Sequence, residues 1–243
     1  MHIRAEAIIL STRGHGEHGT VARALTREHG VQPGYVRGGR SRRIRPVLQA
    51  ANVVLGEWRA RTDEQLAALT VELVRSRGAL HAEPLPAAAL TWSTALAAAA
   101  LPEAQAYPHI HDALSGLLDA VEAAPAARGW AAALARYELV VLAELGFGLD
   151  LERCAATGAT DDLGYVSPRS GAAVSRGAAV GYETKLLPLP RFLSEGGAAD
   201  WPDIFDALRI SGHFLARDVV VDRAADALAA RGRLLDMLRR AHA

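Results

Sequence analysis

The chain has 243 residues, half of them hydrophobic, and its 27 Lys and Arg residues are balanced by 27 Asp and Glu residues. The single cysteine excludes an intramolecular disulfide framework and an all-cysteine zinc site within one chain. Because residues 1–80 carry 13 Arg against 7 acids, and residues 81–243 carry 14 Lys and Arg against 20 acids, we expect the first third to contact a polyanion.

Five short strands are predicted in the first third of the chain. Apolar and polar residues alternate over Ile3–Ile9 and again over Leu69–Leu73, which is the period of a half-buried strand. Breaks rich in glycine or containing proline separate three further candidates, Thr20–Arg27, Gly34–Arg37 and Val53–Arg61. Five strands in so short a segment predict a small barrel, for which the OB-fold is a common architecture.

A glycine-rich segment follows the first predicted strand. Gly14, Gly16 and Gly19 match the G-x-G-x-x-G pattern of dinucleotide sites, so an NADP-dependent reductase is one alternative function. No repeated alternation of strands and helices follows, as a doubly wound sheet requires, so we prefer a hairpin loop. His15 and His18 in this segment have a spacing compatible with metal ligation, but no nearby residues complete a ligand set.

Five arginines lie within the nine residues 37–45, around the break that follows the third predicted strand. Glycines in this segment allow close backbone approach, and the guanidinium fork binds phosphate oxygens bidentately. The candidate DNA-binding residues are Arg37, Arg40, Arg42, Arg43 and Arg45, with Tyr35 beside them. Tyr35 and Trp58 could each stack on bases or fill the barrel core. A solvated turn is the alternative for the arginines, and a generic RNA-binding OB protein is a further alternative function.

After Pro84 the composition shifts to alanine and leucine, which favours helix. Helices are predicted at about 86–101, 109–123, 128–147, 203–217 and 222–241. Residues 151–200 are rich in glycine and are expected to form a long irregular excursion. The predicted fold class is therefore α+β, with an OB-fold nucleic-acid-binding domain at residues 1–80 and a mostly helical domain at 81–243.

Neither a catalytic motif nor a membrane segment is predicted. The sequence has no G-x-S-x-G elbow, H-E-x-x-H pair or phosphate-binding P-loop, so we expect no enzyme and no cofactor. The N-terminus lacks the features of a secretory signal, and the apolar stretch Pro86–Leu101 is shorter than the roughly 20 residues that span a bilayer. We expect a cytoplasmic protein with no membrane partner.

Three stretches together resemble the bacterial RecO family of DNA repair proteins, and particularly its alphaproteobacterial branch. They are Ala7–Gly19 with Leu25–Gly30 and Tyr35–Arg43, then Arg136–Asp150 running into Cys154, and finally Tyr165–Gly171. The resemblance implies an OB domain that binds single- and double-stranded DNA. It also implies a nucleoid-associated mediator that anneals strands and helps load RecA onto DNA coated by single-stranded-DNA-binding protein (SSB), with RecR and possibly RecF as partners.

Two local expectations follow from the resemblance. Many family members carry a four-cysteine zinc module here, whereas this chain has Cys154 with Thr157, and Ser175 and Ala178 near the second pair. We therefore expect a zinc-module-like insertion that lacks its cysteines and holds no metal. Arg136 and Leu139 are the expected pocket for the SSB C-terminal tail, since a cation beside an aliphatic groove suits a peptide ending in acids and a phenylalanine.

Overall fold

The computed structural model describes residues 1–62, 65–124, 126–220 and 225–242. Two compact units are present. The first comprises Met1–Ala123 with Ala225–Ala241, and the second lies in the part of the chain from Ala124 to residue 220. Within the described residues, none of the helices combines the length and the apolar character needed to cross a membrane.

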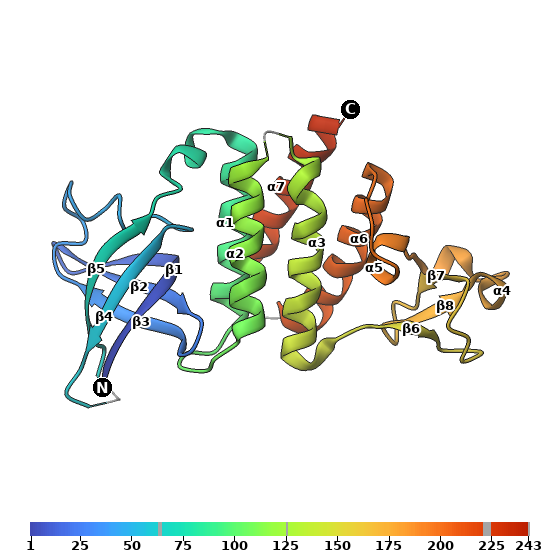
Figure 1. Ribbon diagram of the computed structural model, residues 1–243, viewed down its shortest axis with the longest axis horizontal. Helices are drawn as coiled ribbons and strands as arrows, with labels where there is room; N and C mark the ends of the chain where they lie inside the picture. Colours follow the sequence, from blue (N-terminus) through green and yellow to red (C-terminus); the bar gives the residue numbers. More distant parts are fainter. Residues whose placement is uncertain (63–64, 125, 221–224, 243) are drawn as a thin grey trace. The chain divides into compact units, whose positions relative to one another are not determined.

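A closed five-stranded barrel forms the N-terminal part of the first unit (Figure 1). Its strands are β1 (His2–His15), β2 (Gly19–Thr26), β3 (Gly30–Val36), β4 (Val53–Arg59) and β5 (Ala68–Arg75), arranged in the order β1-β2-β3-β5-β4. All strand pairs are antiparallel except β3–β5, which is parallel where Tyr35 faces Ala68. This arrangement confirms the predicted OB-fold.

The barrel interior is filled by small aliphatic side chains around one large aromatic ring. Trp58 on β4 is completely buried and packs with Ala7 and Ile9 of β1, Ala22 and Ala24 of β2, and other core residues. Of the two roles open for Trp58, the barrel core is therefore the one observed, and base stacking is wrong for this residue.

Two helices follow the barrel within the first unit, and the C-terminal helix joins them there. A 3-10 turn (Gly78–Ala82) leads into α1 (Pro84–Ala100), and α2 (Pro108–Ala123) and α7 (Ala225–His242) complete the set. Pro residues at the start of α1 occupy positions where an amide hydrogen has no helical partner. All three helices were predicted, although residues 222–224 of the last prediction lie outside the described residues.

The second unit is built on α3 (Arg128–Leu142) and α6 (Trp201–Phe214), which pack against each other. Each continues into a π-helical turn, at Ala143–Phe147 and Leu215–Val219. Between the two helices, the buried carboxylate of Glu138 accepts a hydrogen bond of 2.5 Å from the hydroxyl of Ser211. An Asp200 capping box begins α6, which fixes where the chain re-enters helix after residue 200.

Residues 151–200 contain more regular structure than their composition indicates. Four short strands form a sheet in the order β6-β8-β7-β9. They are β6 (Asp150–Cys154), β7 (Leu163–Val166), β8 (Ala172–Ser175) and β9 (Leu187–Pro188), accompanied by the short helices α4 (Arg176–Ala179) and α5 (Arg191–Ser194) and by a 3-10 turn at Glu183–Lys185. The strands β7 and β8 pair antiparallel and form a hairpin after Cys154 that contains the stretch Tyr165–Gly171.

Candidate nucleic-acid interface

The five candidate arginines lie on the connection between β3 and β4, residues 37–52, which we call the arginine loop. Three apolar side chains anchor it, because Leu48 is part of the barrel core and Ile44 and Val47 pack against that core. The Ser41 hydroxyl accepts a hydrogen bond from the Ile44 amide at 3.2 Å, and the Ser41 carbonyl accepts one from the Arg45 amide at 2.9 Å. The loop is therefore folded, with its apolar residues inward.

All five arginines of the loop are exposed. Within the described part of the chain, no carboxylate forms an ion pair with Arg37, Arg40, Arg42, Arg43 or Arg45. An unneutralised cluster of this kind retains its full attraction for a polyanion. All five predicted arginines lie on this one connection of the barrel.

Several other arginines of the first unit are neutralised by carboxylates, in contrast to those of the loop. Arg23 pairs with Glu103 at 3.1 Å, and Arg27 pairs with Asp112 of α2 at 2.9 Å. Hydrogen bonds from Arg27, and then from His111, hold the pKa of Asp112 at about 2, well below its usual range. These arginines hold the barrel and its helices together rather than offering free charge.

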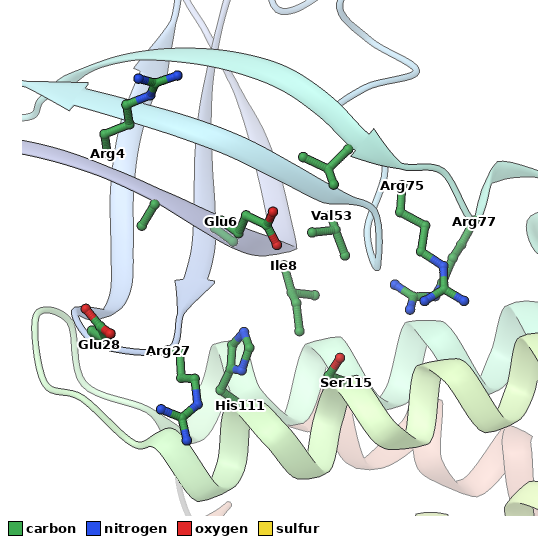
Figure 2. A pocket seen from close by; sticks show the side chains of 13 residues that line it. Arg4, Glu6, Ile8, Arg27, Glu28, Val53, Arg75, Arg77, His111 and Ser115 are labelled. Carbon is green, nitrogen blue, oxygen red and sulfur yellow. The ribbon is translucent and has the colours of Figure 1, made fainter.

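A second group of paired arginines borders a pocket of about 520 Å³ between the barrel and α2 (Figure 2). Arg75 and Arg77 lie close together at one end of this pocket. Both contact Asp119 and Glu122 of α2, at 2.5 to 3.2 Å. The pocket wall is thus largely charge-balanced at this end, unlike the arginine loop.

The end of the arginine loop is fixed by two residues that the sequence did not single out. Asn52 is completely buried, and its side-chain amide donates to the carbonyls of Pro46 and Val47 while its oxygen accepts from the Arg77 amide at 2.8 Å. The buried guanidinium of Arg77 donates to the Ala51 carbonyl at 2.7 Å. Ala51 itself has a φ of 70°, an unusual conformation for a residue with a Cβ.

No sequence signal would have revealed the role of Arg77. An arginine just after a strand is normally solvent-exposed, and only the tertiary packing against α2 buries this one. Asn52 precedes β4 and carries a side chain common in turns, which is a weak signal for a loop anchor.

Tyr35 lies beside the arginine loop, on β3. Its side chain is half-buried, and its ring contacts His15 of the β1–β2 hairpin edge-on, with 5.7 Å between the ring centres. An aromatic ring that is partly exposed next to unpaired arginines has the chemistry needed for base stacking. Its role in binding DNA remains a prediction.

The dinucleotide-site interpretation of the glycine-rich segment is wrong. In the β1–β2 hairpin Gly14 pairs with Thr20 and Gly19 pairs with His15, and Gly16 lies in the turn with a φ of 62°. The strand that follows is β2, whereas a pyrophosphate site requires the N-terminus of a helix there. Among the described residues, no group of three or more His, Cys, Asp or Glu could hold a metal ion, and His15 at the end of β1 and His18 in the turn are both exposed.

The expected SSB-tail residues lie on α3 in the second unit. Arg136 is exposed, and its guanidinium carbon lies 5.1 Å from the centre of the Phe192 ring on α5. Leu139 is half-buried one turn further along the helix. The cation and the aliphatic side chain are therefore on neighbouring positions of one helix, and their binding role remains a prediction.

The four positions of the expected zinc module lie together. The Sγ atom of Cys154 accepts a hydrogen bond from the Ser175 amide at 3.3 Å, and Ala178 packs against the same small core. Hydrogen bonds from Ser175 and then from Thr157 lower the pKa of the Cys154 thiol to about 6. A structural zinc ion needs four ligands, so one thiolate with two hydroxyls and an alanine does not fit it.

Comparison with known proteins identifies the family. Residues 1–77 match the family model for the recombination protein O N-terminal region, and residues 83–223 match the model for the recombination protein O C-terminal region.

Curated relatives agree over nearly the whole chain. The DNA repair protein RecO of Rhodospirillum centenum is 45% identical over 240 residues, covering 98% of this chain and 94% of its own length. The RecO protein of Cereibacter sphaeroides is 42% identical over 242 residues, covering 99% and 100%, and that of Rhizobium johnstonii is 46% identical over 233 residues, covering 95% and 90%. With a barrel of OB topology followed by a helical part, and with both family models matched, the chain belongs to the RecO family of DNA repair proteins.

Proposed function

We propose that the chain is a non-enzymatic recombination mediator that binds single- and double-stranded DNA, anneals complementary strands and helps load RecA onto SSB-coated single strands. Family membership supports a role in DNA repair. The observation that carries the proposal is the arginine loop, where five exposed guanidinium groups have no ion-pair partner among the described residues. Annealing needs no covalent chemistry, because screening the phosphate charge of two strands lowers their mutual repulsion.

The proposal is tested by replacing Arg40, Arg42 and Arg43 with Ala. Phosphate contacts carry no base information, so the variant should bind single strands of every sequence more weakly and should anneal complementary strands more slowly. The matched control is Arg59→Ala, since Arg59 is an exposed arginine of the same barrel that is already paired with Glu57 at 2.6 Å. Unchanged binding and annealing by the triple variant would contradict this function for the loop.

We also propose that Arg136 and Leu139 receive the SSB C-terminal tail. An exposed cation supported by the Phe192 ring, next to a half-buried leucine, suits an acidic peptide that ends in an apolar ring. Titration with a labelled peptide of that tail should saturate with the unmodified protein, and both Arg136→Ala and Leu139→Ser should weaken it. Arg128→Ala is the control, because the Arg128 side chain already donates hydrogen bonds to the Ala199 carbonyl. Equal binding by all variants would place the tail elsewhere.

We propose RecR, and possibly RecF, as the remaining protein partners. Because the proposed ligand is DNA, we also propose that the protein is cytoplasmic and associated with the nucleoid. We propose that residues 1–80 and 81–243 are the two functional domains, an OB domain that holds DNA and a helical domain that holds protein partners. The two family-model matches, which meet between residues 77 and 83, support this division. Two-hybrid or pull-down experiments with each region deleted within the full complex would test it.

A further inference from the structure

A small cavity opens where the arginine loop meets the β1–β2 hairpin. Its volume is about 190 Å³, and its lining includes Thr12, Gly14, Thr20, Gly39, Arg40 and Arg45. All of these residues belong to the first unit. The cavity therefore combines two guanidinium groups, two hydroxyl groups and two glycines.

Thr20 is the unusual member of this set. Its residue is only 6% exposed, yet its hydroxyl has no hydrogen-bond partner within the described part of the chain. The backbone of Thr20 is fully engaged, because β2 pairs it with Gly14 on one side and with Val36 on the other. The hydroxyl oxygen is not fully buried, and Thr20 lines the cavity, so this unpartnered hydroxyl is accessible to a ligand or water there.

The two arginines at the cavity are available to a ligand. Arg40 and Arg45 are exposed and have no carboxylate partner among the described residues. The Arg40 side chain is nevertheless directed by its surroundings, since its backbone amide lies 3.4 Å from the His18 carbonyl and its Nη1 lies 3.5 Å from the Glu17 carbonyl. The guanidinium is thus positioned against the hairpin rather than extended into solvent.

Two glycines make this arrangement possible. A Cβ on Gly14 would collide with the Arg40 guanidinium, and a Cβ on Gly39 would lie 2.6 Å from the Cβ of Thr20. The absence of side chains at both positions lets the loop approach the hairpin closely enough to enclose the cavity. The glycine-rich segment, which does not serve a dinucleotide, has a structural role here.

We propose that this cavity is a phosphate subsite that holds one phosphodiester group of the nucleic-acid backbone. The Thr20 hydroxyl donates a hydrogen bond to a phosphate oxygen, with Thr12 at the rim, and the guanidinium groups of Arg40 and Arg45 neutralise its charge. The inference rests on the proposed DNA-binding function and adds to it a fixed point of contact. The charges of the exposed Arg37, Arg42 and Arg43 then attract the neighbouring phosphates without fixed contacts, whereas the cavity binds one phosphate at a defined position.

Thr20→Val tests the hydroxyl without changing charge or shape much. A lost hydrogen bond to a charged group should weaken binding of a short single-stranded oligonucleotide by about tenfold. The salt dependence of the affinity should stay the same, because no cation is removed. Thr20→Ser, which keeps the hydroxyl, should restore most of the affinity, and Thr70→Val on the exposed face of β5 should have no effect. Wild-type affinity in Thr20→Val, or an equal loss in Thr20→Ser, would overturn the subsite.

Gly14→Ala tests the position of Arg40 independently of Thr20. The added methyl group displaces the guanidinium while every charge of the protein is kept, so affinity should fall by a few-fold at constant net charge. Thermal unfolding of each variant checks that the barrel is intact. Binding by Gly14→Ala equal to wild type would show that Arg40 need not lie in the cavity, which contradicts the inference.

Free phosphate shares the chemistry of the backbone group, and competition separates the two sources. Inorganic phosphate should compete with the oligonucleotide more strongly than chloride at equal ionic strength, and Thr20→Val should lose that excess. If the protein binds inorganic phosphate at this cavity but does not bind the oligonucleotide, the cavity is a site for free anions and the nucleic-acid assignment is refuted. If oligonucleotide binding depends on Arg42 and Arg43 but not on Thr20 or Gly14, the DNA-binding function stands and the subsite is wrong.

Discussion

Arg77 and Arg75 provide a matched pair for testing how the arginine loop is held. Both contact the same two carboxylates of α2, but the side chain of Arg77 is 1% exposed whereas that of Arg75 is 44% exposed. Arg77 also donates to the Ala51 carbonyl at the end of the loop. Replacing each with Met keeps most of the aliphatic stem and removes the guanidinium.

The expected losses differ because of the burial. For Arg77→Met, the Ala51 carbonyl loses its buried donor, which costs about 1–3 kcal/mol. Loss of the contacts to Asp119 and Glu122 adds about 0–1 kcal/mol in all, because these carboxylates are partly exposed and Arg75 still pairs with them. The free energy of unfolding should therefore fall by about 1–4 kcal/mol. Arg75→Met should cost less than about 1 kcal/mol.

Thermal and urea unfolding monitored by circular dichroism measure this difference. For a chain of this size, each kcal/mol corresponds to about 2–4 °C in Tm, so Arg77→Met should lower Tm by about 2–16 °C and Arg75→Met by less than about 4 °C. Neither variant removes a cation of the arginine loop, so the salt dependence of DNA binding by the folded protein should not change. Equal destabilisation by the two variants would refute the argument that Arg77 is a buried anchor.

Three further predictions concern other residues. The pKa of Cys154, about 6, lies below the ordinary value of about 8.5. Between these two pH values the unfolded chain therefore binds more protons than the folded chain, so the free energy of unfolding should rise from pH 6 to pH 9. Ser175→Ala, which removes the largest cause of the lowered pKa, should flatten that rise in urea unfolding measured at the two pH values. Trp58→Ala should cost about 3–5 kcal/mol in the same assay, whereas Trp58→Phe should cost much less, because the indole Nε1 has no hydrogen-bond partner. Asn52→Ala removes the hydrogen bonds that close the arginine loop, so trypsin should cut that loop several-fold faster than in the unmodified protein, and an unchanged cleavage rate would contradict the anchoring role.

The strands of the barrel were predictable to the extent that their alternation is regular. The alternation over Ile3–Ile9 marked β1, but this strand continues to His15. Four consecutive residues, Ala7 to Leu10, are buried, and a register shift follows between Ile9 and Ser11, so the alternation is interrupted. A bulge of this kind removes the period-two signal while leaving the strand intact.

The small sheet of the second unit left no comparable signal. The strands β7 and β8 have four residues each, and β9 has two. A pattern needs more residues than that to distinguish a strand from a turn. Tertiary pairing defines these strands, whereas the long helices α3 and α6 were predictable because their apolar positions repeat over several turns.

The charged residues of the candidate interface were predictable from the sequence, whereas the buried residues that hold the arginine loop in place were not. A cluster of arginines can be counted in a sequence, and their exposure follows from their chemistry. The buried partners that shape the loop could not be anticipated, because the burial of Arg77 depends on a helix more than 40 residues away. The unpartnered hydroxyl of Thr20 is likewise a property of the folded barrel alone.

The salt dependence of single-stranded DNA binding tests the central claim most directly. The logarithm of the affinity falls with the logarithm of the salt concentration by about 0.7 for each phosphate contact that a cation makes with a single strand. If the exposed arginines of the loop bind the DNA backbone, replacing Arg40, Arg42 and Arg43 with Ala should reduce the slope of log affinity against log salt by about 2. The variant should also bind more weakly at every salt concentration below the one at which the two proteins have equal affinity. A triple variant with the slope and affinity of the unmodified protein would contradict the assignment of DNA binding to this loop.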